Sequence, residues 1–149
     1  MRAVIQRVTK AEVRVDGTPV GRIGPGLLLL VAVGKNDTPA TGDALAEKVA
    51  NLRVFDDDQG RMNHSLLDTH REALCVSQFT LYGDCRKGRR PSYDQAAPPE
   101  AAQGLFEGFT QALRGLGVRT ETGRFRARME VELVNDGPVT LLVDTDRVF

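Results

Sequence analysis

A glycine-proline pair, Gly137-Pro138, constrains the fold of this chain more than any other feature. It lies between two segments with the composition of β-strands, Met129–Val134 and Val139–Val143. Proline cannot donate a main-chain hydrogen bond within a sheet, and glycine weakens a strand. We therefore expect a rigid, exposed corner with sheet on both sides. The local sequence alone favours an ordinary hairpin turn, because only about 5–6% of X-Pro bonds in folded proteins are cis.

The composition indicates a single domain, residues 1–149, with an aliphatic core, since 41% of the residues are hydrophobic and none is tryptophan. Lys+Arg and Asp+Glu total 20 each, so only a local basic patch could attract nucleic acid. The longest apolar run, residues 26–33, is far shorter than the roughly 20 residues that span a bilayer. With no signal peptide, we expect a cytoplasmic protein with no membrane partner and two free thiols, Cys75 and Cys85.

Hydrophobic periodicity predicts an α/β fold with the element order β-β-β-α-β-α-β-β-β. Strands are expected at residues 2–8, 11–15, 27–33, 73–79, 118–122, 129–134 and 139–145, and helices at 41–53 and 98–117. Residues 27–33 are apolar throughout, which is typical of a strand covered on both faces. Two helices cannot cover both faces of so many strands. We therefore expect layered sheets with both helices on one side, and a symmetric homodimer that completes the sheet packing.

Candidate catalytic groups lie where the strand at 73–79 runs out into a loop. Ser77 and Thr80 offer hydroxyl groups, and the main-chain N–H groups of Gln78 and Phe79 could face a developing oxyanion. Either hydroxyl could instead make a hydrogen bond that ends the strand. The only histidines, His64 and His70, fall in no triad motif and are more typical of the surface.

An acidic loop, Asp56–Asp58, could hint at a divalent metal ion, but its spacing does not match an EF-hand and no glutamate closes it. We therefore expect a solvated turn there, and neither a metal nor a cofactor in the protein.

Two clusters of basic residues follow the candidate catalytic segment. The first is formed by Arg86, Lys87, Arg89 and Arg90, and the second by Arg124, Arg126 and Arg128. Such density suits phosphate groups, although most charge runs are solvated surface. Because the first cluster adjoins the candidate catalytic segment, nucleic-acid binding and plain surface are equally favoured.

Several motifs together resemble the D-aminoacyl-tRNA deacylase family. They are residues 77–85 (SQFTLYGDC), 87–91 (KGRRP), 135–140 (NDGPVT), 1–8 (MRAVIQRV) and, within 61–66, RMN and SL. The resemblance implies a homodimer that hydrolyses the ester between a D-amino acid and the terminal adenosine of tRNA. It also implies that Ser77, Gln78, Phe79 and Thr80 line the pocket.

The resemblance further implies that a cis Gly137-Pro138 of one subunit enters the pocket of the other. There its carbonyl groups would hold the substrate amino group and leave no room for an L side chain. The basic loop would bind the acceptor stem. We favour attack by a water that Thr80 positions, with Thr80 as the nucleophile if the reaction is covalent. The chain departs from the family at Arg126, where glycine is common, and at Arg128 and His64.

Two other functions fit parts of the sequence. A non-catalytic RNA-binding module would account for the basic loops and the shortage of catalytic side chains. A general esterase would use Ser77 or Cys85 with a histidine. Neither explains the Gly-Pro corner.

Overall fold

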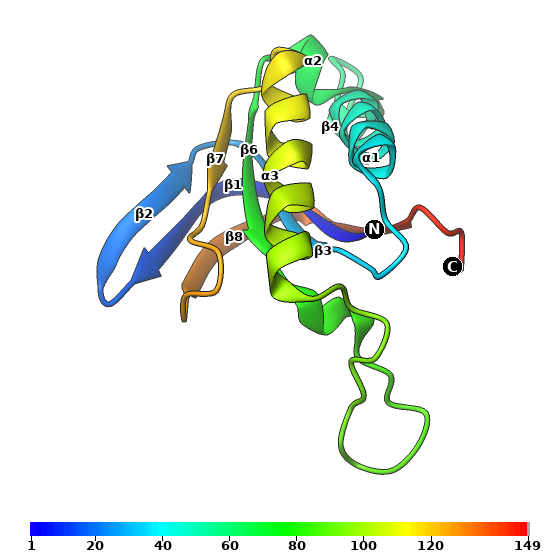
Figure 1. The fold of residues 1–149 in the computed structure, drawn as a ribbon. Helices are drawn as coiled ribbons and strands as arrows, with labels where there is room; N and C mark the ends of the chain where they lie inside the picture. Colours follow the sequence, from blue (N-terminus) through cyan, green and yellow to red (C-terminus); the bar gives the residue numbers. More distant parts are fainter. Residues whose placement is uncertain (149) are drawn as a thin grey trace.

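The computed structural model describes residues 1–148, which form a curled sheet with helices packed on one side (Figure 1). The strands of the main sheet are β1 (Arg2–Val15), β2 (Thr18–Ile23), β3 (Gly26–Ala32), β6 (Glu72–Ser77), β7 (Thr120–Thr122) and β8 (Glu130–Asp144). Two longer helices, α1 (Pro39–Asn51) and α3 (Pro99–Gly115), pack together on one face. The prediction of an α/β fold with two helices on one side is confirmed.

Four smaller elements were not predicted. A short hairpin is formed by β4 (Phe55–Asp56) and β5 (Met62–His64), and α2 (Leu66–Thr69) follows it directly. The 3₁₀-helix η1 (Phe79–Tyr82) begins two residues after β6 ends, so the predicted strand at 73–79 is too long. No helix within residues 1–148 combines the length and the apolar character needed to cross a membrane.

Strand β1 is the centre of the sheet. Along one edge it pairs with β3 over Arg2–Val8 and with β2 over Ala11–Val15, and along the other edge it pairs with β8. Residues 2–8 and 11–15, predicted as two strands, therefore form one. A turn at Asp16-Gly17, with φ angles of 50° and 76°, follows β1. The strand β2 that follows it was missed because Pro19 and Gly21 weaken the strand pattern.

The two strands predicted at residues 129–134 and 139–145 also form a single strand, β8 (Glu130–Asp144), so the expectation of a hairpin turn at Gly137-Pro138 is wrong. The β1–β8 register passes from Gln6↔Thr140 to Val8↔Asn135, which leaves the residues between Asn135 and Thr140 out of the ladder. A bulge allows this because β1 pairs with β8 on either side of the extra residues. The peptide bond within the bulge, Gly137-Pro138, is cis.

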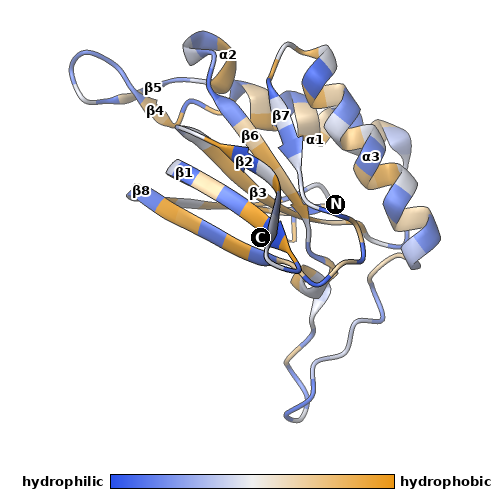
Figure 2. Ribbon diagram, turned by 90° about the vertical axis from the view of Figure 1, so that its left-hand side faces the viewer, coloured by the Kyte–Doolittle hydropathy of each residue, from blue (hydrophilic) through white to orange (hydrophobic). Residues whose placement is uncertain are grey.

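The core occupies both faces of the central strands. Leu27, Leu29 and Val31 of β3 pack under α1 and α3, whereas Leu28 faces a second cluster that includes Val8, Val13 and Leu74. In the hydropathy colouring the strands at the middle of the sheet are largely hydrophobic, whereas α1 and α3, which lie on one side of the sheet, carry both hydrophilic and hydrophobic residues (Figure 2). The expectation that residues 27–33 are covered on both faces is confirmed, and part of the cover on the second face comes from β2 and β8 of the same chain.

The sheet curls until β2 approaches β7. A Cβ atom on Gly21 would lie 2.5 Å from the main-chain oxygen of Thr122, so only glycine allows this approach. The curl brings the start of β8 round to the end of β6, where the cavity described next is formed.

Candidate active site

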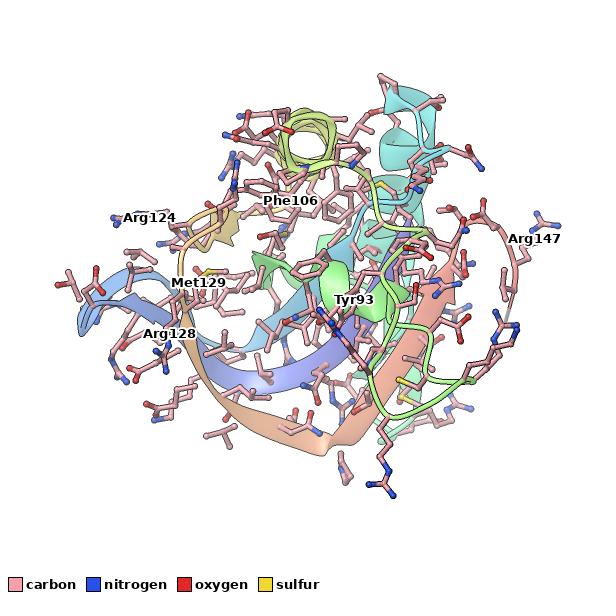
Figure 3. All side chains as sticks on the ribbon, turned by 60° about the horizontal axis from the view of Figure 1, so that its bottom comes forward. Tyr93, Phe106, Arg124, Arg128, Met129 and Arg147 are labelled. Carbon is pink, nitrogen blue, oxygen red and sulfur yellow. The ribbon has the colours of Figure 1, made fainter. Side chains whose placement is uncertain are left out.

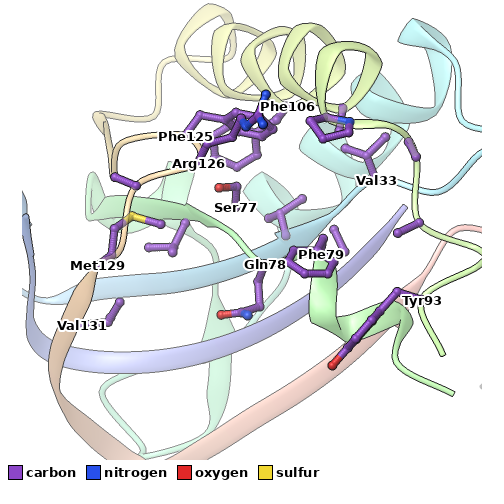
Figure 4. Close-up of a pocket in the computed structure, with 18 residues that line it drawn as sticks. Val33, Ser77, Gln78, Phe79, Tyr93, Phe106, Phe125, Arg126, Met129 and Val131 are labelled. Atoms are coloured by element: carbon purple, nitrogen blue, oxygen red, sulfur yellow. The ribbon is translucent and has the colours of Figure 1, made fainter. Parts of the chain in front are cut away.

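A cavity of about 640 Å³ opens between the end of β6, the start of α3 and the segment that leads into β8 (Figure 4). Its walls are mainly apolar and include four aromatic rings. Phe79 and Tyr93 meet edge to face with their ring centroids 5.1 Å apart, and Phe106 and Phe125 lie 6.2 Å apart. A volume of this size accepts a ligand as large as a nucleoside.

The candidate catalytic segment forms one rim of this cavity. Ser77, Gln78 and Phe79 line it, and Thr80 follows in the first turn of η1. Arg2 supports η1 from behind, because its Nη1 donates to the main-chain oxygen of Leu81 at 3.1 Å. The guanidinium also lies over the Tyr82 ring, 4.4 Å from its centroid. The rim is therefore fixed to β1.

One predicted oxyanion donor needs correction. The main-chain N–H of Gln78 donates to the carbonyl oxygen of Val31 at 2.8 Å, so it continues the sheet and cannot serve an oxyanion. The N–H groups of Phe79 and Thr80 lie in the first turn of η1, where a helix supplies no carbonyl partner. Within this segment, the N–H groups of Phe79 and Thr80 are therefore the candidate oxyanion donors.

The Thr80 hydroxyl is exposed and accepts a hydrogen bond from Nε2 of Gln78. An amide N–H is a donor and cannot remove a proton, so this contact does not activate Thr80 as a nucleophile. It fixes the hydroxyl oxygen and leaves its proton free to point towards a ligand.

The histidines and cysteines give little support to a general esterase. His64 lies in β5 and His70 ends α2, and neither lines the cavity with Ser77. Cys75 is fully buried in β6, and burial raises the pKa of its thiol to about 12, so it is inert at neutral pH. Cys85 is exposed outside the cavity.

Two carboxylates of the acidic loop, Asp56–Asp58, make hydrogen bonds and an ion pair within the protein. Asp57 accepts hydrogen bonds from the main-chain N–H groups of Arg61 at 3.0 Å and Gln59 at 2.9 Å, and these bonds lower the pKa of its carboxyl group. Asp56 pairs with Arg7, its Oδ1 lying 3.2 Å from Nη1. Within residues 1–148, no three carboxylate, imidazole or thiol groups are arranged to hold a metal ion.

Gly137 and Pro138 are exposed and do not line the cavity of their own chain. Gly137 has a φ of 121°, and a Cβ atom there would lie 2.8 Å from Cγ2 of Val139 and 3.1 Å from Nη2 of Arg7. Arg7 is buried beneath the corner, with its Nε 3.3 Å from the main-chain oxygen of Asp136. Only glycine fits at this position.

The first basic cluster lies on a loop that projects away from the body of the protein (Figure 1). Arg86 folds back onto Asp84, with Nη2 2.6 Å from Oδ2, and the charge pair lowers the pKa of Asp84. The other three cations, Lys87, Arg89 and Arg90, are exposed. They are therefore better placed than Arg86 to meet a ligand.

Most of the cavity wall was not predicted from the sequence. Residues 83–97 fall outside every predicted strand and helix, yet the main-chain N–H of Ala97 donates to the oxygen of Val33 at 2.9 Å, and Tyr93 lines the cavity. Phe106, Phe125, Met129 and Val131 also line the cavity, and none of them was a predicted site residue. In the sequence, the small apolar residues Ala96 and Ala97 before α3 could have indicated that this segment packs against the rest of the protein.

Comparison with known proteins decides the family. A sequence model described as D-Tyr-tRNA(Tyr) deacylase matches residues 4–144. A D-aminoacyl-tRNA deacylase from Thermosipho africanus is 59% identical over 149 residues, which is the full length of both chains. The chain belongs to the D-aminoacyl-tRNA deacylase family. It is therefore a hydrolase that acts on ester bonds.

Solved structures agree with this deacylase fold. A c-Myc DNA unwinding element binding protein superposes with a TM-score of 0.91 at 40% identity, over 97% of this chain and 98% of its own. A probable eukaryotic D-amino acid tRNA deacylase has a TM-score of 0.83 at 18% identity, over 95% and 97% of the two chains. The second match supports the fold alone.

Proposed function

We propose that this deacylase hydrolyses the ester between a D-amino acid and the 3′-terminal adenosine of tRNA. The cavity carries the proposal, because aromatic walls suited to stacking a base adjoin the N–H groups of Phe79 and Thr80. An adenosine placed against these walls would present its acylated ribose to the rim. The protein would act in the cytoplasm, and it would need neither a metal nor a cofactor.

Hydrolysis of an aminoacyl ester needs only modest catalytic assistance from the protein, because the ester is already activated. One well-placed oxyanion donor contributes about 3–4 kcal/mol of transition-state stabilisation. In this mechanism water attacks the carbonyl carbon, the N–H groups of Phe79 and Thr80 stabilise the oxyanion, and the Thr80 hydroxyl positions the water. The neighbouring ribose hydroxyl of the substrate helps to activate the water, in place of a histidine. Ser77 shapes the rim.

Chiral selection follows from a homodimer in which Gly137-Pro138 of one subunit reaches the cavity of the other. The corner is exposed and held by Arg7, and it lies outside the cavity of its own chain, as this arrangement requires. The carbonyl groups of the corner bind the substrate amino group, so an L side chain collides with the wall. Selection is thus by exclusion. Because glycine has no side chain, glycyl-tRNA is also a substrate.

The basic loop would bind the phosphates of the acceptor stem. Lys87, Arg89 and Arg90 are exposed on the projecting loop, and Arg86 would contribute after exchanging its contact with Asp84 for a phosphate.

The proposed function is tested by deacylation of matched D-tyrosyl-tRNA and L-tyrosyl-tRNA with the purified dimer. We expect rapid release of D-tyrosine and no release of L-tyrosine above the spontaneous rate, with glycyl-tRNA also cleaved. A non-catalytic RNA-binding module would protect all three esters. A general esterase would cleave both enantiomers and be inactivated by a covalent serine or thiol reagent.

A further inference from the structure

Arg126 holds an unusual position at the cavity. Among the residues within 1–148 that line it, Arg126 is the only one that carries a charge. It lies on the wall formed with Phe106 and Phe125, across the cavity from Gln78 (Figure 4). The side chain keeps 65% of its surface exposed, so the guanidinium stands at the opening instead of the floor.

The backbone at Arg126 adopts a conformation that side chains rarely take. Its φ is 62°, in the left-handed region, within a turn closed by a hydrogen bond from the N–H of Ala127 to the oxygen of Arg124. The neighbouring arginines, Arg124 and Arg128, project from the same segment and do not line the cavity (Figure 3). The turn thus directs one arginine of the three to the opening.

The ion pair that Arg126 makes with Glu100 is weak, and a ligand could replace it. Glu100, in the first turn of α3, approaches Nη1 of Arg126 at 3.5 Å, and 80% of its side chain is exposed. An exposed pair with a single contact contributes little stability. A phosphate offers the guanidinium a more strongly charged partner with two oxygens in the right geometry, and can displace the carboxylate.

We propose that Arg126 binds the phosphodiester that joins the terminal adenosine to the preceding nucleotide. This inference rests on the proposed function. If the adenosine fills the aromatic cavity, its 5′ phosphate must leave through the opening, where Arg126 supplies the cation. Glu100 holds the guanidinium at the opening while the cavity is empty.

The test compares two substrates that differ in the phosphate. We expect Arg126→Gly to raise the KM for D-tyrosyl-tRNA about tenfold with kcat little changed, the loss expected for one charge-assisted hydrogen bond. The KM for 3′-D-tyrosyl-adenosine, which has no phosphate, stays at the wild-type value. Glycine accepts a φ of 62° without strain, so the variant keeps its fold.

The chain offers a matched control in Arg147, which is also an exposed arginine in the left-handed region, with a φ of 55°. It does not line the cavity, and it is drawn far from Arg124 and Arg128 in Figure 3. Arg147→Gly removes the same charge and the same strain, and leaves both KM values unchanged. Glu100→Gln lowers the KM for D-tyrosyl-tRNA, because it removes the competitor.

Equal effects of Arg126→Gly on both substrates, or an effect on neither, overturn the inference. Calorimetric binding of the trinucleotide CCA and of adenosine provides a measurement that does not depend on catalysis. Arg126→Gly weakens binding of CCA and spares binding of adenosine. If the wild-type protein leaves both esters intact, the proposed function fails; if CCA binding is unaffected by Arg126→Gly, this inference fails.

Discussion

Nε of Arg7 lies 3.3 Å from the main-chain oxygen of Asp136, the residue immediately before the Gly-Pro corner. The same guanidinium donates from Nη1 to the oxygen of Val54 at 2.7 Å and pairs with Asp56 at 3.2 Å. One buried side chain thus joins the corner in β8 to the β4–β5 hairpin. The position of the corner therefore depends on the contacts that the Arg7 guanidinium makes with Asp136 on one side and with Val54 and Asp56 on the other.

We expect Arg7→Met to lower the free energy of unfolding by about 2–4 kcal/mol, because it leaves the buried oxygen of Val54 without a donor. Deacylation of D-tyrosyl-tRNA should fall at least tenfold, an order-of-magnitude expectation for a displaced binding group, and rejection of L-tyrosyl-tRNA should weaken. Urea unfolding and paired deacylation assays measure these effects. The control is Asp56→Asn, which removes only a half-exposed charge partner and should change stability by less than about 1 kcal/mol.

Gly137→Ala should abolish D-aminoacyl-tRNA deacylation while the protein still folds. The new methyl group would lie 2.8 Å from Cγ2 and 3.0 Å from the nitrogen of Val139, so the exposed corner must shift. Gly60→Ala is the matched control, because Gly60 has a φ of 72° and nothing within 4 Å of a Cβ atom. It should cost about 1 kcal/mol of stability and leave activity intact. Equal activity of the two variants would remove the corner from substrate selection.

Thr80→Ala should retain substantial activity, within roughly tenfold of wild type, because the N–H groups of the η1 turn do not depend on the side chain. Single-turnover deacylation of D-tyrosyl-tRNA measures the chemical step directly. A loss of several orders of magnitude would instead identify Thr80 as the nucleophile.

Arg89→Glu should weaken tRNA binding and reduce the slope of log K against log salt by about one unit, since one phosphate contact is lost. Arg86→Ala should have a smaller effect, because Arg86 already pairs with Asp84. Binding isotherms at several salt concentrations give the slope. An unchanged slope for Arg89→Glu would exclude the loop from the interface, and Arg147→Glu controls for a general change in net charge.

One thiol should react in the native protein and two in denaturant. Burial raises the pKa of Cys75 from its ordinary value of 9.0 to about 12, whereas Cys85 is exposed. A thiol kept neutral in the folded state lowers stability once the unfolded chain can ionise, so the free energy of unfolding should fall as pH rises from about 9 towards 12. Cys75→Ala should remove that part of the pH dependence. Thiol titration and unfolding at pH 8 and pH 10 check both points.

The fold was largely predictable because its strands and helices carry strong local patterns. The apolar run at residues 27–33 was correctly predicted as a strand covered on both faces, and α3 lies within the helix predicted at 98–117, with Phe106, Phe109 and Leu113 on its buried side. The errors arose where long-range pairing decides the structure. The Gly-Pro pair suggested a turn, but the β1–β8 ladder on either side of it keeps β8 continuous.

The candidate site was predictable only in part. The rim residues Ser77, Gln78 and Phe79 followed from their place at a strand end, and the structure places them in the cavity. The N–H of Gln78 donates its hydrogen bond to Val31, a residue of another strand, so no local sequence pattern could predict that this N–H is unavailable to a ligand. Likewise Tyr93 and Phe125 reach the cavity from segments without regular structure.

Strand β8 carries both Val131, in the wall of the cavity, and Gly137, in the corner. The strand thus sets the spacing between these two positions. Because successive side chains of a strand point to opposite faces, inserting or deleting one residue between them would turn Val131 outwards or move the corner off Arg7. Changes in chain length should therefore leave the fold intact when they fall in the tip of the basic loop, residues 86–90, and disturb it when they fall between positions 131 and 137.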